Sequence, residues 1–112
     1  MHHRVARVSN LIKEELGYLL EREVEFPEAL VTVMEVACSR KMERAVVYLS
    51  VLPVHKSDAM LKIARENQAR LQFLLLRKMN IRPMPRIHFA IDRGQDNAAR
   101  VEKLLLEDTM KE

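Results

Sequence analysis

The chain has 112 residues, which fits a single domain, and 48% of them are hydrophobic, which excludes an intrinsically disordered chain. The single cysteine excludes internal disulfides and multi-cysteine zinc sites, and the apolar runs are far shorter than the ~20 residues that span a bilayer. The net charge of +3 is modest, so its distribution along the chain matters more than its total. We expect one domain, residues 1–112, in the cytoplasm, with no export signal and no membrane interaction.

The first predicted element is a helix from Arg4 to about Glu23. Its apolar residues recur three and four positions apart, the spacing that builds one stripe on an amphipathic helix: Val5, Val8, Ile12, Leu16 and Leu19. Pro27 ends this element, because proline lacks a backbone N–H and clashes inside a helix.

Two strands are predicted next, over residues 30–38 and 44–52, because both stretches are rich in β-branched residues. Alternation in the first strand places four residues on one face: Leu30, Thr32, Met34 and Val36. The short polar connection 39–43 favours an antiparallel hairpin, and Pro53 closes the second strand.

A long amphipathic segment is predicted to begin with Ser57 or Asp58 as a helix cap. Asn67 lies in the middle of its apolar stripe, and Phe73 and Leu76 fall on the solvent side of a straight helix. We therefore expect a break near residues 67–69 that gives two helices with a kink. If the kink rotates the second helix, as we expect, Phe73 and Leu76 join the core; otherwise they form an exposed apolar spot.

Residues 87–91 alternate between apolar and other side chains and predict a short third strand. Asp96 can cap a final helix that carries Val101, Leu104 and Leu105, followed by a frayed tail over residues 107–112. The element order predicts an α+β domain with helices packed on one face of a three-stranded sheet. The long segment between the second and third strands supplies the crossover that links them.

Five sequence motifs, in this order and spacing, resemble the ribosome-binding factor A family, a bacterial maturation factor of the small ribosomal subunit. They are Arg4-x-x-Arg7-Val8, Val31-Thr32-Val33, Ala45-x-Val47-Tyr48-Leu49-Ser50, Ile81-Arg82-x-x-Pro85-x-Ile87-x-Phe89-x-x-Asp92, and Val101 with Leu104-Leu105. The resemblance covers nearly the whole chain. It implies a type II KH-like RNA-binding domain, association with the free 30S subunit, and help with late maturation and processing of 16S rRNA.

The chain departs from the family pattern at several positions. It has no Gly-x-x-Gly loop, and the kink Asn67-Gln68-Ala69 has Ala69 where the family usually has glycine. Gln72 stands where an arginine is frequent, and Lys41 stands in the hairpin where an aspartate is common. The first two departures weaken the case for an RNA contact by the kink backbone, whereas Lys41 makes the hairpin more basic.

Basic side chains supply the candidate RNA surface. Residues 57–86 hold seven Lys and Arg against two Asp and Glu, a local charge of +5 that suits a phosphate-facing surface or a solvated helix face. The predicted RNA-binding residues are Arg4, Arg7, Arg40, Lys41, Lys62, Arg65, Arg70, Arg77, Lys78, Arg82 and Arg86. Lys78 projects near the apolar stripe, and Arg82 has an alternative structural role through carbonyl hydrogen bonds at the helix end.

No residue pattern points to catalysis. The histidines, His2, His3, His55 and His88, lack metal-ligand spacing, and Cys38 ends a strand as a small buried hydrophobe without an activating base. There is no phosphate-binding glycine loop and no serine elbow. We expect no enzyme activity, no metal, no cofactor and no small-molecule substrate.

The sequence leaves one alternative to RNA binding. In that alternative the chain is a protein–protein interaction module that uses a sheet edge or the Phe73 and Leu76 spot, and its basic residues serve solubility. Nothing such as a heptad repeat indicates a dimer, so a monomer is expected.

Overall fold

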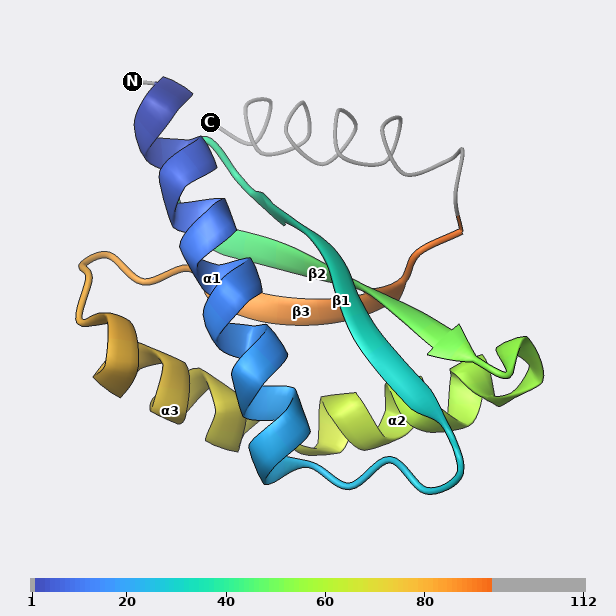
Figure 1. The fold of residues 1–112 in the computed structure, drawn as a ribbon. Coiled ribbons are helices and arrows are strands. Elements are labelled where there is room, and N and C mark those ends of the chain that lie inside the picture. Colours follow the sequence, from blue (N-terminus) through green and yellow to red (C-terminus); the bar gives the residue numbers. More distant parts are fainter. Residues whose placement is uncertain (1, 94–112) are drawn as a thin grey trace.

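The computed structural model describes residues 2–93, so the predicted final helix and the tail lie outside the described residues. Three helices and a three-stranded sheet form the described part (Figure 1). In chain order the elements are α1 (His2–Glu23), β1 (Leu30–Cys38), β2 (Arg44–Leu52), the 3-10 helix η1 (Val54–Lys56), α2 (Ser57–Glu66), α3 (Gln68–Met79) and β3 (Arg86–Ile91). Both predicted strands of the hairpin have the bounds that the sequence indicated.

The sheet is mixed, with strand order β1-β2-β3. β1 and β2 are antiparallel, with Val31 opposite Val51, whereas β2 and β3 are parallel, with Arg44 opposite Arg86. The crossover between the parallel strands consists of η1, α2 and α3, as the sequence predicted. Because α1, α2 and α3 all pack on one face of the sheet, the predicted α+β architecture is confirmed (Figure 1).

The core lies between the helices and the inward face of the sheet. Ile12 and Leu16 of α1 are fully buried, as are Leu71 and Leu75 of α3. They meet alternate residues of the strands: Val33, Val36, Ala45, Val47, Leu49, Ile87 and Phe89. The predicted apolar stripe of α1 is therefore the face that builds the core, and replacing one such leucine by alanine costs about 2–5 kcal/mol of stability.

A β-bulge in β1 corrects one sequence prediction. The register with β2 shifts between Val33 and Glu35, so Val33 and Val36 both face the core. Leu30 and Met34 are exposed. The expectation that Val36 shares a face with those two residues is wrong, because the extra residue at the bulge reverses the alternation.

The predicted kink is present at Asn67, which separates α2 from α3. Its backbone N–H donates to the carbonyls of both Ile63 and Ala64, and its side-chain amide donates to Ile63 O at 2.8 Å. A polar side chain is therefore satisfied at the break, which explains its place within an apolar stripe.

The start of α2 differs from the sequence prediction. Lys56 occupies the cap position of α2 without a side-chain hydrogen bond, and the Ser57 hydroxyl donates back to Val54 O, so the predicted Ser57 or Asp58 cap is wrong. The helix instead continues from η1, which supplies its first turn. At the other end Asn80 adopts a left-handed conformation, with φ 49°, and terminates α3.

Candidate nucleic-acid interface

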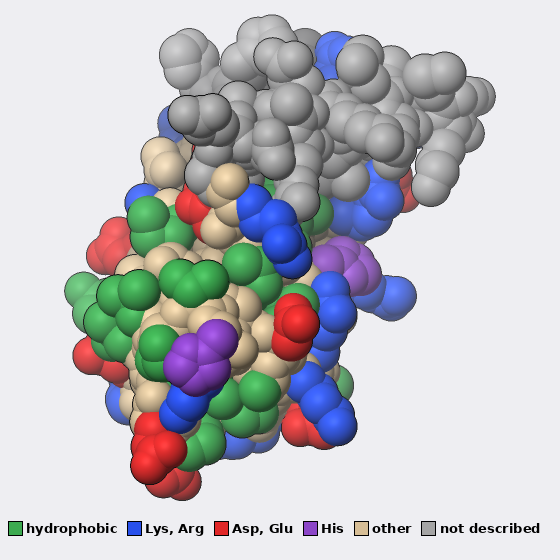
Figure 2. Space-filling model, turned by 90° about the vertical axis from the view of Figure 1, so that its right-hand side faces the viewer, with side chains coloured by type: hydrophobic (Ala, Val, Ile, Leu, Met, Phe, Trp, Pro, Cys, Tyr) green, Lys and Arg blue, Asp and Glu red, His purple; other side chains and the backbone are tan. Residues whose placement is uncertain are grey.

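All of the predicted RNA-binding side chains are exposed, Lys78 included. They come from the start of α1, the β1–β2 turn, α2, α3, the segment before β3, and β3 itself. Figure 2 shows one face of the molecule. Most Lys and Arg side chains on this face gather along one side of it, and most hydrophobic side chains lie along the other side. On this face the basic side chains are thus gathered rather than evenly scattered.

The β1–β2 turn is fixed by a buried serine. Ser39 is fully buried, and its hydroxyl oxygen accepts from the backbone N–H groups of Glu43 and Arg44, both at 3.1 Å. Its carbonyl accepts from the N–H of Met42 at 3.0 Å. Because these bonds hold the turn closed, Lys41 at its tip has a defined position beside the sheet.

One hollow of the basic side contains Lys41 together with residues of β2 and β3. Arg44, Arg86 and His88 line it, and Met42, Pro83 and Met84 supply apolar walls. Arg44 was not among the predicted site residues, since its proximity to Arg86 depends on the parallel register. His88 has a pKa below its ordinary value, because partial burial and the nearby Arg44 and Arg86 disfavour its charged form. The imidazole is therefore neutral at pH 7.

A second hollow lies at the kink, and its lining residues are Arg65, Glu66, Gln68, Ala69, Gln72 and Arg86. Arg86 lines both hollows, so it joins the turn residue Lys41 to the kink. We call the cluster of Lys41, Arg44, Arg65 and Arg86 the basic cluster.

The kink side of the basic cluster also closes the outer edge of β3. Arg65 donates to Phe89 O at 3.2 Å. The Gln72 amide donates to Pro85 O at 3.0 Å, and its oxygen accepts from the N–H of Ile87 at 2.8 Å. From the sequence, Gln72 was notable only because it stands where the family frequently has an arginine. Its amide offers both a donor and an acceptor, which an arginine does not.

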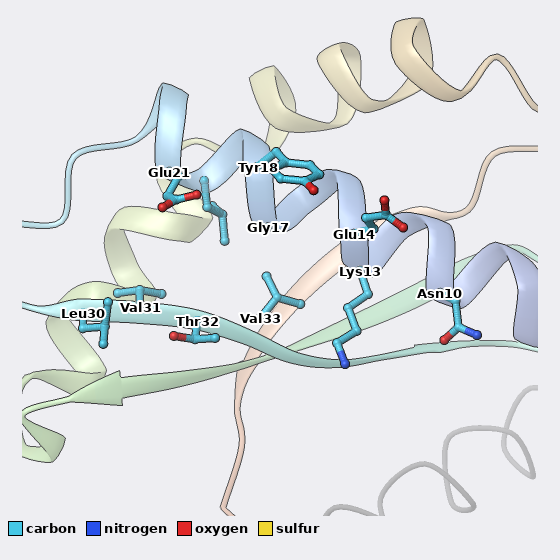
Figure 3. Close-up of a pocket in the computed structure, with 11 residues that line it drawn as sticks. Asn10, Lys13, Glu14, Gly17, Tyr18, Glu21, Leu30, Val31, Thr32 and Val33 are labelled. Atoms are coloured by element: carbon cyan, nitrogen blue, oxygen red, sulfur yellow. The ribbon is translucent and has the colours of Figure 1, made fainter.

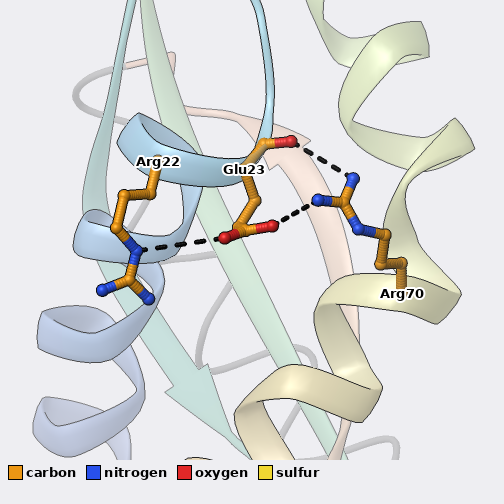
Figure 4. Close-up of polar contacts among 3 residues, drawn as sticks. All are labelled: Arg22, Glu23 and Arg70. Carbon is orange, nitrogen blue, oxygen red and sulfur yellow. Dashed lines mark hydrogen bonds and ion pairs between the residues drawn. The ribbon is translucent and has the colours of Figure 1, made fainter.

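Arg70 is tied to the end of α1 (Figure 4). Its guanidinium donates to the Glu23 carbonyl at 3.2 Å and forms an ion pair with the Glu23 carboxylate, which also lies 4.0 Å from Arg22 Nε. The Arg70 side chain is about half exposed, so the pair contributes no more than about 1 kcal/mol. Part of the Arg70 charge is thus neutralised within the protein.

The start of α1 contacts the segment before β3 at Arg82. Arg4 donates to Arg82 O at 3.3 Å and so links α1 to the segment before β3. Arg82 contributes its carbonyl to this contact and not its guanidinium, which is different from the structural role that the sequence offered as an alternative. Arg7, Arg40 and Lys62 lie exposed elsewhere on the same elements.

Phe73 and Leu76 lie on the surface, with exposed fractions of 57% and 38%, so the expectation that they join the core is wrong. The reason is the mildness of the kink: Asn67 still donates to Ile63 O and accepts from the N–H of Leu71, which keeps the helical phase across the break. Arg77 lies over the Phe73 ring, 5.7 Å from its centroid.

Known proteins resemble this chain in sequence and in fold. The family model "Ribosome-binding factor A" matches residues 4–105. The chain belongs to this family. Ribosome-binding factor A of Azotobacter vinelandii is 28% identical over 97% of this chain and 92% of the relative, and that of Chlorobium limicola is 33% identical over 96% and 92%.

Solved structures of ribosome-binding factor A agree with the fold. The crystal structure from Thermus thermophilus has a TM-score of 0.61 and 26% identity, covering 83% of this chain and 97% of that one. A second Thermus thermophilus structure is a homology model fitted into a cryo-EM map of a 30S complex. It has a TM-score of 0.57 and 25% identity, covering 75% of this chain and 94% of that one.

Ribosome-binding factor A is a non-enzymatic ribosome-binding factor. Burial raises the pKa of the Cys38 thiol, although a hydrogen bond with Ser9 acts in the opposite direction. Cys38 is therefore the protonated, buried residue that the sequence predicted. Within residues 2–93, no group of three or more His, Cys, Asp or Glu side chains is placed to hold a metal, and no helix is long and apolar enough to cross a membrane.

Proposed function

We propose that this protein is a cytoplasmic assembly factor that binds the free 30S subunit and assists the late maturation and processing of 16S rRNA. The observation that carries the proposal is the basic cluster, in which side chains from the hairpin turn, α2 and β3 meet around two adjoining hollows. The 30S complex of the Thermus thermophilus relative supports the choice of partner.

Phosphate contacts supply most of the affinity in this proposal. Because the hollows hold no Gly-x-x-Gly loop, the backbone of the RNA is bound by cationic side chains rather than by loop N–H groups. If about five cations engage single-stranded or irregular RNA, log K falls with log salt with a slope of roughly −3.5. By holding one arrangement of the phosphates, the protein stabilises a maturing conformation of the rRNA over its alternatives.

The first test is sedimentation of the purified protein with 30S subunits and with 70S ribosomes through sucrose gradients in low and high salt. We expect co-migration with free 30S subunits alone, lost in high salt. Arg86→Glu weakens this binding, whereas Arg22→Glu, the same change of charge on the far end of α1, leaves it intact. Binding that resists salt and both substitutions would refute the proposal and favour a protein–protein interaction module.

A further inference from the structure

A groove of about 610 Å³ runs between α1 and β1 (Figure 3), and β1 is at the other edge of the described sheet from β3. Its volume lies within the range of ordinary ligand sites. One wall is α1, which includes Leu20, and the other wall is the first half of β1, residues 30–33. The basic cluster shares no residue with this groove.

The β1 wall is a sheet edge. Among the described residues, the strand order β1-β2-β3 gives β1 a neighbour on one side only, so half of its backbone N–H and C=O groups point away from β2. Within residues 2–93, no hydrogen bond outside the sheet involves residues 30–33. These groups are therefore ready to pair with another extended segment. An edge strand beside a helix is the geometry in which an added peptide strand gains both backbone bonds and side-chain contacts.

Gly17 is the second observation that points to an occupant. It lies in the interior of α1, on the groove wall, and a Cβ added there meets nothing within 4 Å. A glycine inside a helix is destabilising relative to alanine, and no neighbouring atom within 4 Å requires it here. The absence of a side chain at this point keeps the middle of the groove open.

The rim of the groove indicates the chemistry of the occupant. Tyr18 and Leu30 are large apolar residues with exposed fractions of 56% and 62%. Glu14 and Glu21 lie on the same wall, about 10 Å apart along the helix at 1.5 Å per residue, which about three residues of an extended peptide span. Lys13 is the single cation among the lining residues, and its side chain extends from α1 toward β1 (Figure 3), so the lining carries one net negative charge.

We propose that this groove binds an extended segment of a partner protein, rich in Lys or Arg alternating with apolar residues, which adds to β1 as a fourth strand. The backbone of the segment pairs with residues 30–33. Its basic side chains meet Glu14 and Glu21, and its apolar side chains fill the space beside Gly17. The proposal does not depend on RNA binding, since it uses none of the basic cluster.

The test is titration of the ¹⁵N-labelled full chain with three synthetic ten-residue peptides, followed by NMR. The first alternates Lys and Val, the second has Pro at every Val, and the third has Glu at every Lys. We expect only the first to shift the amide signals of residues 14–21 and 30–33. The proline peptide loses the backbone pairing, and the acidic peptide is repelled by Glu14 and Glu21.

Three variants guard against a misleading result. Gly17→Leu fills the groove and is expected to weaken the peptide at least ~10-fold, with an unfolding temperature measured alongside. Glu14→Lys with Glu21→Lys alters only exposed positions, so it keeps the fold and is expected to weaken the peptide by a similar factor. Arg86→Glu leaves peptide binding unchanged, which separates this proposal from the fate of the 30S proposal.

Three outcomes would overturn the inference. Equal shifts with all three peptides mean nonspecific contact, and shifts confined to the basic cluster mean binding elsewhere. If no peptide shifts the β1 amides but these signals broaden as the protein concentration rises, the edge pairs with a second copy of the chain. Sedimentation equilibrium of the free protein then reports the dimer.

Discussion

The two edges of the sheet are built differently. At the β3 edge, Arg65 and Gln72 reach from the crossover helices and bond the backbone of Phe89, Pro85 and Ile87. At the β1 edge, α1 stands off and leaves a groove beside residues 30–33. Side chains already bond the N–H of Ile87 and the carbonyl of Phe89, so the β3 edge has fewer groups left for another strand than the β1 edge. In the two proposals, the β3 side therefore binds RNA through charge, and the β1 side binds a peptide through backbone pairing.

Charge follows the same division. The basic cluster surrounds the closed edge, while Glu14 and Glu21 stand beside the open one. A polyanion and a basic peptide can therefore approach opposite sides of one small domain without competing, because each is repelled by the side that attracts the other.

Charge reversal in the basic cluster tests the closed edge as an RNA surface. Lys41→Glu together with Arg86→Glu should weaken 30S binding on the order of a hundredfold and reduce the salt slope by about 1.4, that is, by ~0.7 for each lost phosphate contact. Filter binding over a range of salt concentrations gives both values. A loss of affinity with an unchanged slope would contradict a direct phosphate role for these side chains.

Removing the amide that closes the β3 edge tests its structural part. Gln72→Leu should lower the free energy of unfolding by about 1–3 kcal/mol, because the N–H of Ile87 and the carbonyl of Pro85 lose their partner. Urea denaturation measures this change. Gln68→Leu, a neighbour for which the structure shows no hydrogen bond of the side chain, is the matched control and should change stability by less than about 0.5 kcal/mol.

At the open edge the expected sign is reversed. Gly17→Ala should raise the free energy of unfolding by roughly 0.5–1 kcal/mol, because alanine favours the helix and its Cβ meets nothing within 4 Å. A higher urea midpoint with an unchanged slope would establish the gain. Destabilisation by this small side chain would mean that the groove is not open space in solution.

Within residues 2–93, the sequence was sufficient for the α-helices and strands and insufficient for the contacts at the sheet edges. The β-branched runs and Pro53 defined both strands of the hairpin, and the polar Asn67 within an apolar stripe located the kink. Local periodicity does not describe which side chains reach across the fold. The bonds of Gln72 depend on the segment before β3 turning back over α3, and the nearness of Arg44 to Arg86 depends on parallel register. Phe73 was misplaced for a related reason, since the phase of α3 depends on hydrogen bonds at Asn67.

The smallest effect is a pH dependence at the closed edge. The pKa of His88 in the folded protein lies below its ordinary value of 6.5, through partial burial and then the charges of Arg44 and Arg86. Between the folded and unfolded pKa values the unfolded chain binds more protons, so stability rises with pH across that window. The contribution of His88 to the free energy of unfolding is fully present above pH 6.5. It is lost as the pH falls from 6.5 to the pKa of His88 in the folded protein.

Replacement of this histidine isolates its share of the pH dependence. His88→Gln should flatten the decline in unfolding free energy below pH 6.5, and the exposed His55→Gln should leave the decline as it is in the parent protein. Urea titrations at several pH values between 5 and 8 give the comparison.

A phosphate bound in the hollow of Arg44 and Arg86 would offset their charge at the imidazole and raise the pKa of His88. Measuring that pKa by NMR with and without RNA therefore tests whether the hollow holds the ligand: an unchanged value would place the RNA elsewhere on the basic side.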